Sequence, residues 1–398
     1  MRKTWLWFLL GWLVLFVPEI LRIYFIMPFP GSQVDDTINI AYFLHKYIFY
    51  IRILGAAIIV VPLYQYIRYG RWFKKVGAIL FALVYLLAFY FATRIAQADR
   101  IFVQPKHKVF ASVDSNNVDE RNYVIGVALN GEAKAFPIQF IGYHHQVRDT
   151  IGGTPVIVTY CTVCRSGRAY SPVVNGKVET FRLVGMDHFN AMFEDASTGS
   201  WWRQENGEAI AGPMTGKYLT EIPSEQVTLH SWIAEHPNTL IMQRDTSFNE
   251  IYDSLAGYDK GTDRGGVLEG TDTASWEGKS WVVGVIADGK PKAYDWNDLK
   301  KTHCINDTVG SFPVLVTLEA DTFSFHAFNR NVDSTVLAFA WSDSTKILTD
   351  TNTHSLWDAE GVCTSGALQG KRLNTLPAYQ EFWHSWHTFH PTTTAMKN

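Results

Sequence analysis

The sequence predicts a mainly β protein of the α+β class, in which three transmembrane helices precede two tandem copies of an antiparallel β-rich module. Three long apolar stretches near the start of the chain predict the helices. Short runs of β-branched and aromatic residues, separated by Asn-Gly and Asp-Gly pairs, predict β-hairpins with tight turns. One sequence pattern occurs twice, so we expect the two modules to share a fold.

The three apolar stretches are residues 5–27, 48–66 and 76–92. They are long enough to cross a hydrocarbon core of ~30 Å at about 1.5 Å per residue. Glu19 and Arg22 interrupt the first stretch, and because they lie three residues apart on one helical face they can pair within the bilayer. The lipid bilayer is therefore an expected partner. Three spans exceed what anchoring requires, which makes another membrane protein a candidate partner.

Positive charges in the short loops predict the orientation of these helices. Arg2 and Lys3 precede the first span, and two arginines and two lysines fill residues 68–75, whereas residues 31–47 contain two aspartates and one lysine. We therefore expect a bacterial inner-membrane protein with its N-terminus in the cytoplasm and both modules in the periplasm, where disulfides can persist. The formal net charge of −3 gives no basic surface, so nucleic acid is not an expected partner.

The repeat is clearest at the start of each module. Residues 123–136 match residues 281–294 at an offset of 158 (281 − 123 = 158), and the same offset aligns residues 155–159 with residues 313–317. Directly afterwards the copies differ, because the two cysteines of the first copy have no counterpart in the second. The first copy is thus expected to carry the function, and the second to be a degenerate partner.

We expect four parts of the chain. They are a membrane domain (1–98), a first β-rich module carrying a CxxC motif (99–245), a linker (246–278) and a second, degenerate module (279–398). The linker is rich in Gly, Asp, Ser and Thr and lacks periodicity. A helix is predicted to close each module, over residues 226–235 with Ser224 as its cap, and over residues 379–389.

The CxxC motif of Cys161 and Cys164 follows a predicted buried strand and precedes the next hairpin. Two thiols in such a turn can bind a soft metal, form a redox disulfide or serve as a structural staple. A structural zinc site normally needs a second CxxC or paired histidines, and neither follows in the sequence. A thioredoxin-type motif would open a helix, whereas this one leads into β structure. All three interpretations stay open at this point.

Two adjacent histidines lie upstream of the motif. His145 has an equivalent in the second copy, His303, whereas His144 does not, so His144 and the cysteines are absent together from that copy. An imidazole with two thiolates is a donor set for copper or zinc. We therefore expect a metal site formed by Cys161, Cys164 and His144, with copper preferred to zinc and His145 as a secondary candidate. A polar pair at the start of a strand is the simpler interpretation of the two histidines.

Two further groups are secondary candidates. Met186, His188 and Met192 combine thioether and imidazole groups, which suit Cu(I), although alternation along a strand explains their spacing as well. Cys304 and Cys363 lie apart from any CxxC motif. A disulfide between them would close a loop of about 60 residues and contribute on the order of 4 kcal/mol.

Several segments of the first copy share a specific pattern. They are residues 124–126, 130–135, 149–156, 159–164 and 207–213. Together they resemble a bacterial family named domain of unknown function 3179, over about residues 122–242. That family typically has Trp-His-Glu where this chain has Tyr143-His144-His145, and Gly where it has Arg165. His144 and both cysteines of the CxxC motif match positions typical of the family, and the resemblance implies no activity.

The leading hypothesis from the sequence is a membrane-anchored periplasmic protein whose first module binds a thiophilic metal through the CxxC motif and His144. The alternatives are a thiol–disulfide oxidoreductase and a non-catalytic scaffold or subunit of a membrane complex. No Gly-x-Ser-x-Gly, P-loop or His-Glu-x-x-His pattern occurs, so hydrolase and nucleotide-binding functions have no support. The sequence does not decide whether the protein is an enzyme, and it indicates no cofactor beyond copper or zinc.

Overall fold

The computed structural model describes residues 3–262 and 268–396 and forms two compact units. The first unit comprises Met1–Val103 and Glu179–Tyr218, and the second comprises Gln104–Val178 and Leu219–Asn398. Residues 179–218, which the sequence placed in the first module, thus group with the membrane helices. Both copies of the repeat contribute to the second unit.

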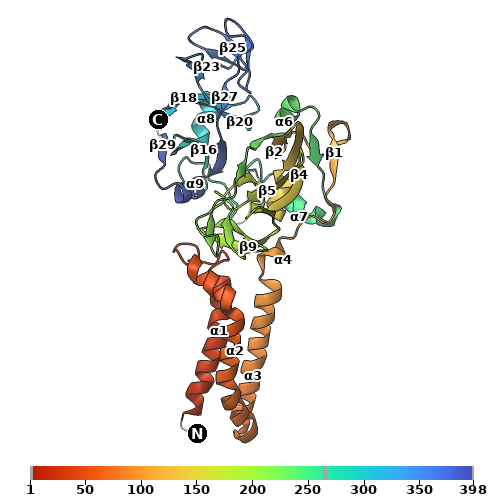
Figure 1. The fold of residues 1–398 in the computed structure, drawn as a ribbon, viewed down its shortest axis with the longest axis vertical. Helices are drawn as coiled ribbons and strands as arrows, with labels where there is room; N and C mark the ends of the chain where they lie inside the picture. Colours follow the sequence, from red (N-terminus) through yellow and green to blue (C-terminus); the bar gives the residue numbers. More distant parts are fainter. Residues whose placement is uncertain (1–2, 263–267, 397–398) are drawn as a thin grey trace. The chain divides into compact units, whose positions relative to one another are not determined.

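Three long apolar helices begin the first unit (Figure 1). They are α1 (Thr4–Tyr24), α2 (Ile38–Tyr69) and α3 (Trp72–Tyr90). Each is long and apolar enough to cross a membrane, when α3 is taken together with the π-helical turn that continues it to Ile95. The prediction of three long apolar helices is therefore confirmed. The predicted pair also forms, with Arg22 Nε donating to Glu19 Oε2 at 2.9 Å. A short helix, α4 (Ala98–Ile101), follows.

A four-stranded antiparallel sheet completes the first unit. Its order is β12 (Ala209–Ala211), β11 (Trp201–Arg203), β10 (Asn190–Asp195) and β9 (Phe181–Asp187). Met192 and Trp201 of this sheet pack with Ile26 and Ala41, which lie between and at the start of the helices. The sheet is therefore attached to the helices through an apolar cluster of their own unit.

The first copy in the second unit is built on two sheets. One has the order β1 (Phe110–Ser112), β15 (Leu240–Met242), β3 (Glu132–Pro137), β2 (Tyr123–Leu129), β14 (Glu225–Thr228), and the other β13 (Glu221–Ile222), β6 (Ser166–Tyr170), β5 (Thr154–Cys161), β4 (Gln146–Ile151). A two-stranded ribbon and two helices accompany them: β7 (Val173–Val174), β8 (Lys177–Val178), α5 (Ile138–His144) and α6 (Leu229–Glu235).

The second copy repeats this arrangement. Its first two sheets have the orders β28 (Ala378–Phe382), β16 (Trp281–Ala287), β17 (Lys290–Asp295), β29 (Thr394–Met396) and β18 (Cys304–Val309), β19 (Phe312–Leu318), β20 (Phe325–Asn329), β27 (Asn374–Thr375). The remaining elements are β21 (Asn331–Val332), β22 (Thr335–Val336), β23 (Phe339–Ser342), β24 (Ile347–Asp350), β25 (Leu356–Trp357), β26 (Cys363–Ser365), α8 (Trp296–Thr302) and α9 (Trp383–Phe389).

Matching strand orders support the repeat read from the sequence. The orders β28-β16-β17-β29 and β18-β19-β20-β27 correspond to β14-β2-β3-β15 and β4-β5-β6-β13. The glycines shared by the two copies have a packing reason, because a tryptophan of the closing helix lies against each. A Cβ atom on Gly126 would come within 2.3 Å of Trp232, and one on Gly284 within 2.2 Å of Trp386. Only glycine allows so close an approach.

The predicted starts of the two closing helices are wrong. Residues 225–228 form β14, which pairs antiparallel with β2, and helix α6 begins only after Thr228, whose side chain accepts a hydrogen bond from Ser231 N. Thr228, not Ser224, is therefore the cap. In the second copy β28 likewise occupies residues 378–382 and pairs with β16. Sheet pairing with a distant strand overrides the local helical pattern.

The predicted linker is partly folded onto the first copy. It contains a 3₁₀ turn (Thr246–Phe248) and α7 (Asn249–Ser254). Tyr258 is buried in the core of the first copy, and Arg165 Nη1 donates to its carbonyl oxygen at 3.2 Å. This segment therefore supplies core residues, while residues 263–267 lie outside the described part of the chain.

Candidate functional site

The CxxC motif lies where β5 ends and β6 begins. Cys161 is the last residue of β5 and pairs with Ser166, the first residue of β6, while Cys164 lies in the turn between them. Both cysteines are 0 % exposed. The structure holds both sulfurs as thiols, and the two side chains are hydrogen-bonded to each other. The local fold thus places two neighbouring thiols in the protein interior.

The second copy covers the CxxC turn. The Phe382 N–H donates to the Cys164 carbonyl oxygen at 2.9 Å, and the Ser385 side chain is hydrogen-bonded to the Cys164 thiol. Lys279 Nζ donates to the Val163 carbonyl oxygen at 2.6 Å. Phe382 and Ser385 lie at the junction of β28 with α9. The thiols therefore lie at the interface between the two copies.

Burial controls the charge of these groups. It raises the pKa of Cys164 well above its usual value, and the hydrogen bond with Cys161 raises it further, so this thiol is protonated at neutral pH. Burial lowers the pKa of the Lys279 ammonium group, whereas the negative charge of Cys164 or Cys161 would raise it. Burial, followed by the charge of Lys279, lowers the pKa of His384 to about 4. A negative charge on the sulfurs would have Lys279 as its counter-charge.

A polar cluster takes the place of the thiols in the second copy. Glu319 is the equivalent of Cys161 (319 − 161 = 158). Its Oε1 accepts a hydrogen bond from Ser231 Oγ at 2.6 Å, and His326 Nε2 lies 2.8 Å from the same oxygen. Ser231 is the equivalent of Ser385 (385 − 231 = 154). Each copy thus contacts the closing helix of the other with the same turn, but only the first copy does so with cysteines.

His144 has a different environment from the one that the sequence suggested. It ends α5, it is 0 % exposed, and its Nε2 lies 2.6 Å from the hydroxyl oxygen of Tyr252 on α7. Within residues 3–262 and 268–396, no group of three or more His, Cys, Asp and Glu side chains is arranged to hold a metal ion. The structure therefore does not assemble Cys161, Cys164 and His144 into a three-ligand site, and ligation by His144 stays a prediction.

His145 has a structural role that recurs in both copies. Its Nδ1 lies 2.9 Å from the Tyr160 carbonyl oxygen, and His303 Nδ1 lies 3.0 Å from that of Leu318. Both histidines adopt the left-handed conformation that ends a helix, with φ of 57° and 56°. Burial lowers the pKa of His145 to about 4. This histidine is a neutral helix terminator.

The methionine and histidine group lies in the first unit. Met192 is buried in the apolar cluster of that unit, and the Met186 N–H donates to the Ile26 carbonyl oxygen at 2.8 Å. His188 Nδ1 lies 2.9 Å from Asp187 Oδ1, and this hydrogen bond raises the pKa of His188. The contacts of all three residues have structural explanations, and metal binding by them stays a prediction.

Cys304 and Cys363 pack in one apolar cluster of the second copy. Both are free thiols, with Cys304 Sγ 3.7 Å from the Phe339 carbonyl oxygen and Cys363 Sγ 3.4 Å from that of Ser365. A disulfide between them stays a prediction.

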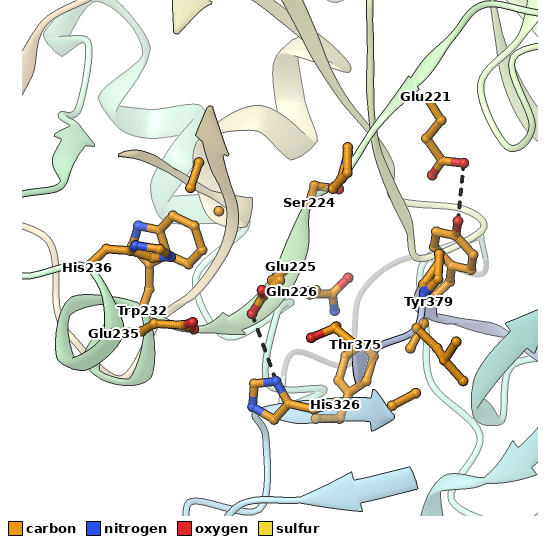
Figure 2. Close-up of a pocket in the computed structure, with 18 residues that line it drawn as sticks. Glu221, Ser224, Glu225, Gln226, Trp232, Glu235, His236, His326, Thr375 and Tyr379 are labelled. Carbon is orange, nitrogen blue, oxygen red and sulfur yellow. Dashed lines mark hydrogen bonds and ion pairs between the residues drawn. The ribbon is translucent and has the colours of Figure 1, made fainter. Parts of the chain in front are cut away.

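A pocket of about 500 Å³ opens between the two copies (Figure 2). The first copy supplies Glu225 from β14 and Trp232 from α6, and the second supplies His326 from β20 and Tyr379 from β28. Figure 2 shows the Glu225 carboxylate directed toward His326, whose Nδ1 is 3.9 Å away. This pocket is distinct from the buried thiols.

The sequence did not single out the residues that surround the thiols or line the pocket. Ser385 belongs to a His-Ser-Trp pattern that occurs at residues 230–232 and again at residues 384–386, and this recurrence is a signal that could have drawn attention to it. Lys279, Glu225 and His326 carry no such signal, because their neighbours come from distant parts of the chain.

A family model described as "Protein of unknown function (DUF3179)" matches residues 104–393. The match includes both copies and the segment between them, so it extends beyond the first-copy resemblance read from the sequence. No curated protein and no solved structure matches the chain.

Proposed function

The chain belongs to the DUF3179 family, and from its own residues we propose that it binds a soft metal ion, Cu(I), through the sulfurs of Cys161 and Cys164. The observation that carries this proposal is the buried, hydrogen-bonded pair of thiols at the interface of the copies. Thiolate sulfur is a soft ligand that favours Cu(I) and zinc over hard cations such as magnesium and calcium. Enclosure by protein would also keep the bound ion from water and from oxidants.

The balance of charge supports the same proposal. Binding of one Cu(I) would displace both thiol protons and leave a bis-thiolate complex with one net negative charge. An uncompensated charge in the protein interior is costly. The Lys279 ammonium group, which hydrogen-bonds the CxxC turn through the Val163 carbonyl oxygen, is available to offset it. Metal uptake is therefore expected to release two protons and to require Lys279.

Copper is favoured over zinc by the number of donors. Structural zinc sites almost always have four protein ligands. The described residues include no group of three or more His, Cys, Asp and Glu side chains suited to a metal ion, whereas two sulfurs suffice for linear Cu(I). His144 would be a third donor only after leaving Tyr252, to which it is bonded at 2.6 Å. We therefore favour the two-sulfur form over the three-ligand form.

Thiol–disulfide exchange has less support. A redox-active cysteine attacks as a thiolate and must be accessible to its substrate. Cys161 and Cys164 are both 0 % exposed, and burial raises the pKa of Cys164. A staple in which the two sulfurs form a permanent disulfide is the remaining alternative, and thiol counting distinguishes it from a metal site.

We also propose where this site lies in the cell. The positive residues before α1 and between α2 and α3 support a cytoplasmic location for those segments, which would leave the two copies in the periplasm of a bacterium. A buried thiol site there would serve in the storage, delivery or sensing of copper. The membrane helices would hold the site near a membrane-protein partner.

Titration with Cu(I) tests the proposal. The full chain, purified in a non-ionic detergent under anaerobic conditions, is titrated against a colorimetric Cu(I) chelator, and thiols are counted before and after reduction. We expect one copper per chain and a loss of at least a hundredfold in affinity in Cys161→Ser or Cys164→Ser, because removing one sulfur leaves a single donor. Cys304→Ser and Cys363→Ser are matched controls that should bind as tightly as the unchanged protein.

Two results would overturn the proposal. Absence of copper binding with both thiols titratable would exclude the metal site, and two fewer titratable thiols before reduction, restored by reductant, would support the staple. His144→Ala separates the two forms of the site. If His144→Ala lowers the affinity for Cu(I) at least tenfold, the three-ligand form is favoured. If the affinity is unchanged, the two-sulfur form is favoured.

A further inference from the structure

The pocket between the copies has the size of a site for a small organic molecule. Its volume of about 500 Å³ falls within the range of about 300–1,000 Å³ that is typical of ligand pockets. It is formed by β14 and α6 of the first copy and by β20, β27 and β28 of the second. A ligand here would touch both copies.

The charges around this pocket are predominantly negative. Three glutamates and no lysine or arginine are among its described lining residues. Glu221 accepts a hydrogen bond from the Tyr379 hydroxyl at 3.1 Å, and Glu235 lies 3.8 Å from Arg372 Nη1. Glu221 thus accepts a hydrogen bond, whereas the ion pair of Glu235 is long.

Glu225 is the carboxylate that is best placed to receive a ligand. Among the described residues its side chain makes no hydrogen bond, and its one ion pair, with His326 Nδ1, is long at 3.9 Å. His326 lies closer to Glu319, whose Oε1 is 2.8 Å from His326 Nε2. Figure 2 shows Glu225 and His326 on facing walls. A positive group entering the pocket would give Glu225 the hydrogen-bond donor that it lacks.

Apolar and aromatic side chains form much of the remaining lining, with a few polar side chains among them. Trp232 packs closely against β2 because Gly126 has no side chain, and its indole N–H donates to Thr239 Oγ1 at 2.8 Å. Leu376 and Pro377 of the second copy also line the pocket. Aromatic faces attract cations, and apolar walls favour a ligand with a hydrocarbon body.

We propose that this pocket binds a small organic ammonium ion, with its charged nitrogen beside the Glu225 carboxylate and its hydrocarbon body between Trp232 and Leu376. The proposal does not depend on metal binding by the cysteines, because the pocket contains neither thiol. The interface between the copies would then have two sites, one for Cu(I) at the cysteines and one for an ammonium ion in the pocket.

Three probes with one carbon skeleton test the charge requirement. Cyclohexylmethylamine, cyclohexylmethanol and cyclohexanecarboxylate are titrated into the full chain in a non-ionic detergent by isothermal calorimetry, with ligand-observed NMR as a second readout. We expect saturable binding of the amine, and binding at least tenfold weaker for the alcohol and the carboxylate.

Variants locate the site. Glu225→Gln should weaken amine binding at least tenfold, whereas Glu250→Gln, which changes an exposed glutamate of α7, should leave it unchanged. Leu376→Trp places a larger side chain in the lining of the pocket and should also weaken amine binding at least tenfold, which provides a test if Glu225→Gln fails to fold. Cys161→Ser should bind the amine like the unchanged protein. Equal binding of the alcohol, no binding of the amine, or unaltered binding in both pocket variants would each overturn the proposal.

Discussion

Gln226 and Gln380 occupy equivalent positions in the two copies and are hydrogen-bonded to each other, with Gln226 Nε2 donating to Gln380 Oε1 at 2.8 Å. Their equivalence follows from register, because Gln226 pairs with Ile125 on β2 and Gln380 with Val283 on β16 (283 − 125 = 158). Contact between equivalent residues is expected where two copies are related by an approximate two-fold axis. The interface that covers the thiols is thus an internal counterpart of a symmetric dimer.

Replacing Gln380 should destabilise this interface. Gln380 Oε1 also accepts a hydrogen bond from Arg165 Nε at 2.7 Å, so Gln380→Leu would leave a buried amide and a buried guanidinium group without this acceptor. We expect the free energy of unfolding to fall by about 3 kcal/mol. Chemical denaturation of the full chain in detergent, followed by tryptophan fluorescence, measures the change. Gln369→Leu, at an exposed position, is the control. An equal effect of both variants would contradict the role of Gln380 in stabilising the interface.

Acid should destabilise the second unit through His145. Burial lowers the folded-state pKa of His145 to about 4, below the usual value of 6.5. Between these values the unfolded chain binds a proton that the folded chain does not, so stability falls as the pH drops from 6.5 toward 4, by up to about 1.4 kcal/mol per pH unit. His384 contributes in the same direction.

The variant His145→Asn should flatten this pH dependence. Asparagine tolerates the left-handed conformation and does not titrate. Denaturation midpoints measured from pH 4 to pH 7 should show a shallower slope in the variant, by about one proton. An identical slope in both proteins would show that His145 is not the titrating group.

The membrane helices contain a buried ion cluster, and its removal should lower the stability of the protein. Glu19 is 1 % exposed, and it accepts hydrogen bonds from Arg22 Nε and, at 2.6 Å, from Arg52 Nε. Glu19→Gln would leave two arginines without their counter-charge, and we expect a loss of about 3–5 kcal/mol. The thermal aggregation temperature in detergent should fall accordingly. Adding Arg52→Met to this variant should restore part of the loss, and no restoration would contradict the pairing.

Reporter fusions test the proposed orientation. A reporter that is active only outside the cytoplasm should work when fused after Arg100, and one that is active only in the cytoplasm should work when fused after Gly70. The reason is the excess of lysine and arginine in the segment around Gly70. The reverse pattern would place the thiols in a reducing compartment.

Local sequence signals predicted much of the fold. The Asn130-Gly131 pair correctly indicated the β2–β3 hairpin, and the apolar stretches indicated the three helices. The start of α6 was misread because Glu225–Thr228 pairs with β2, a long-range contact that leaves no mark in the local pattern. The packing of Tyr258 into the first core was missed for the same reason.

The candidate site was predicted less completely than the fold. The absence of the cysteines from the second copy drew attention to the CxxC turn, and the structure shows this turn buried at an interface. The sequence could not show that Lys279 and Ser385 lie beside this turn, because their approach depends on how the two copies pack. Nor could it show that His144 is bonded to Tyr252 in the segment taken as a linker.

The donor atoms around bound copper test the central claim most directly. The full chain is loaded anaerobically with one equivalent of Cu(I), and X-ray absorption at the copper edge reports the nearest neighbours of the metal. We predict two sulfur neighbours, and a different spectrum when Cys161 and Cys164 are both replaced by serine. The absence of sulfur among the nearest neighbours of copper, or an unchanged spectrum in that double variant, would contradict metal binding by the CxxC motif.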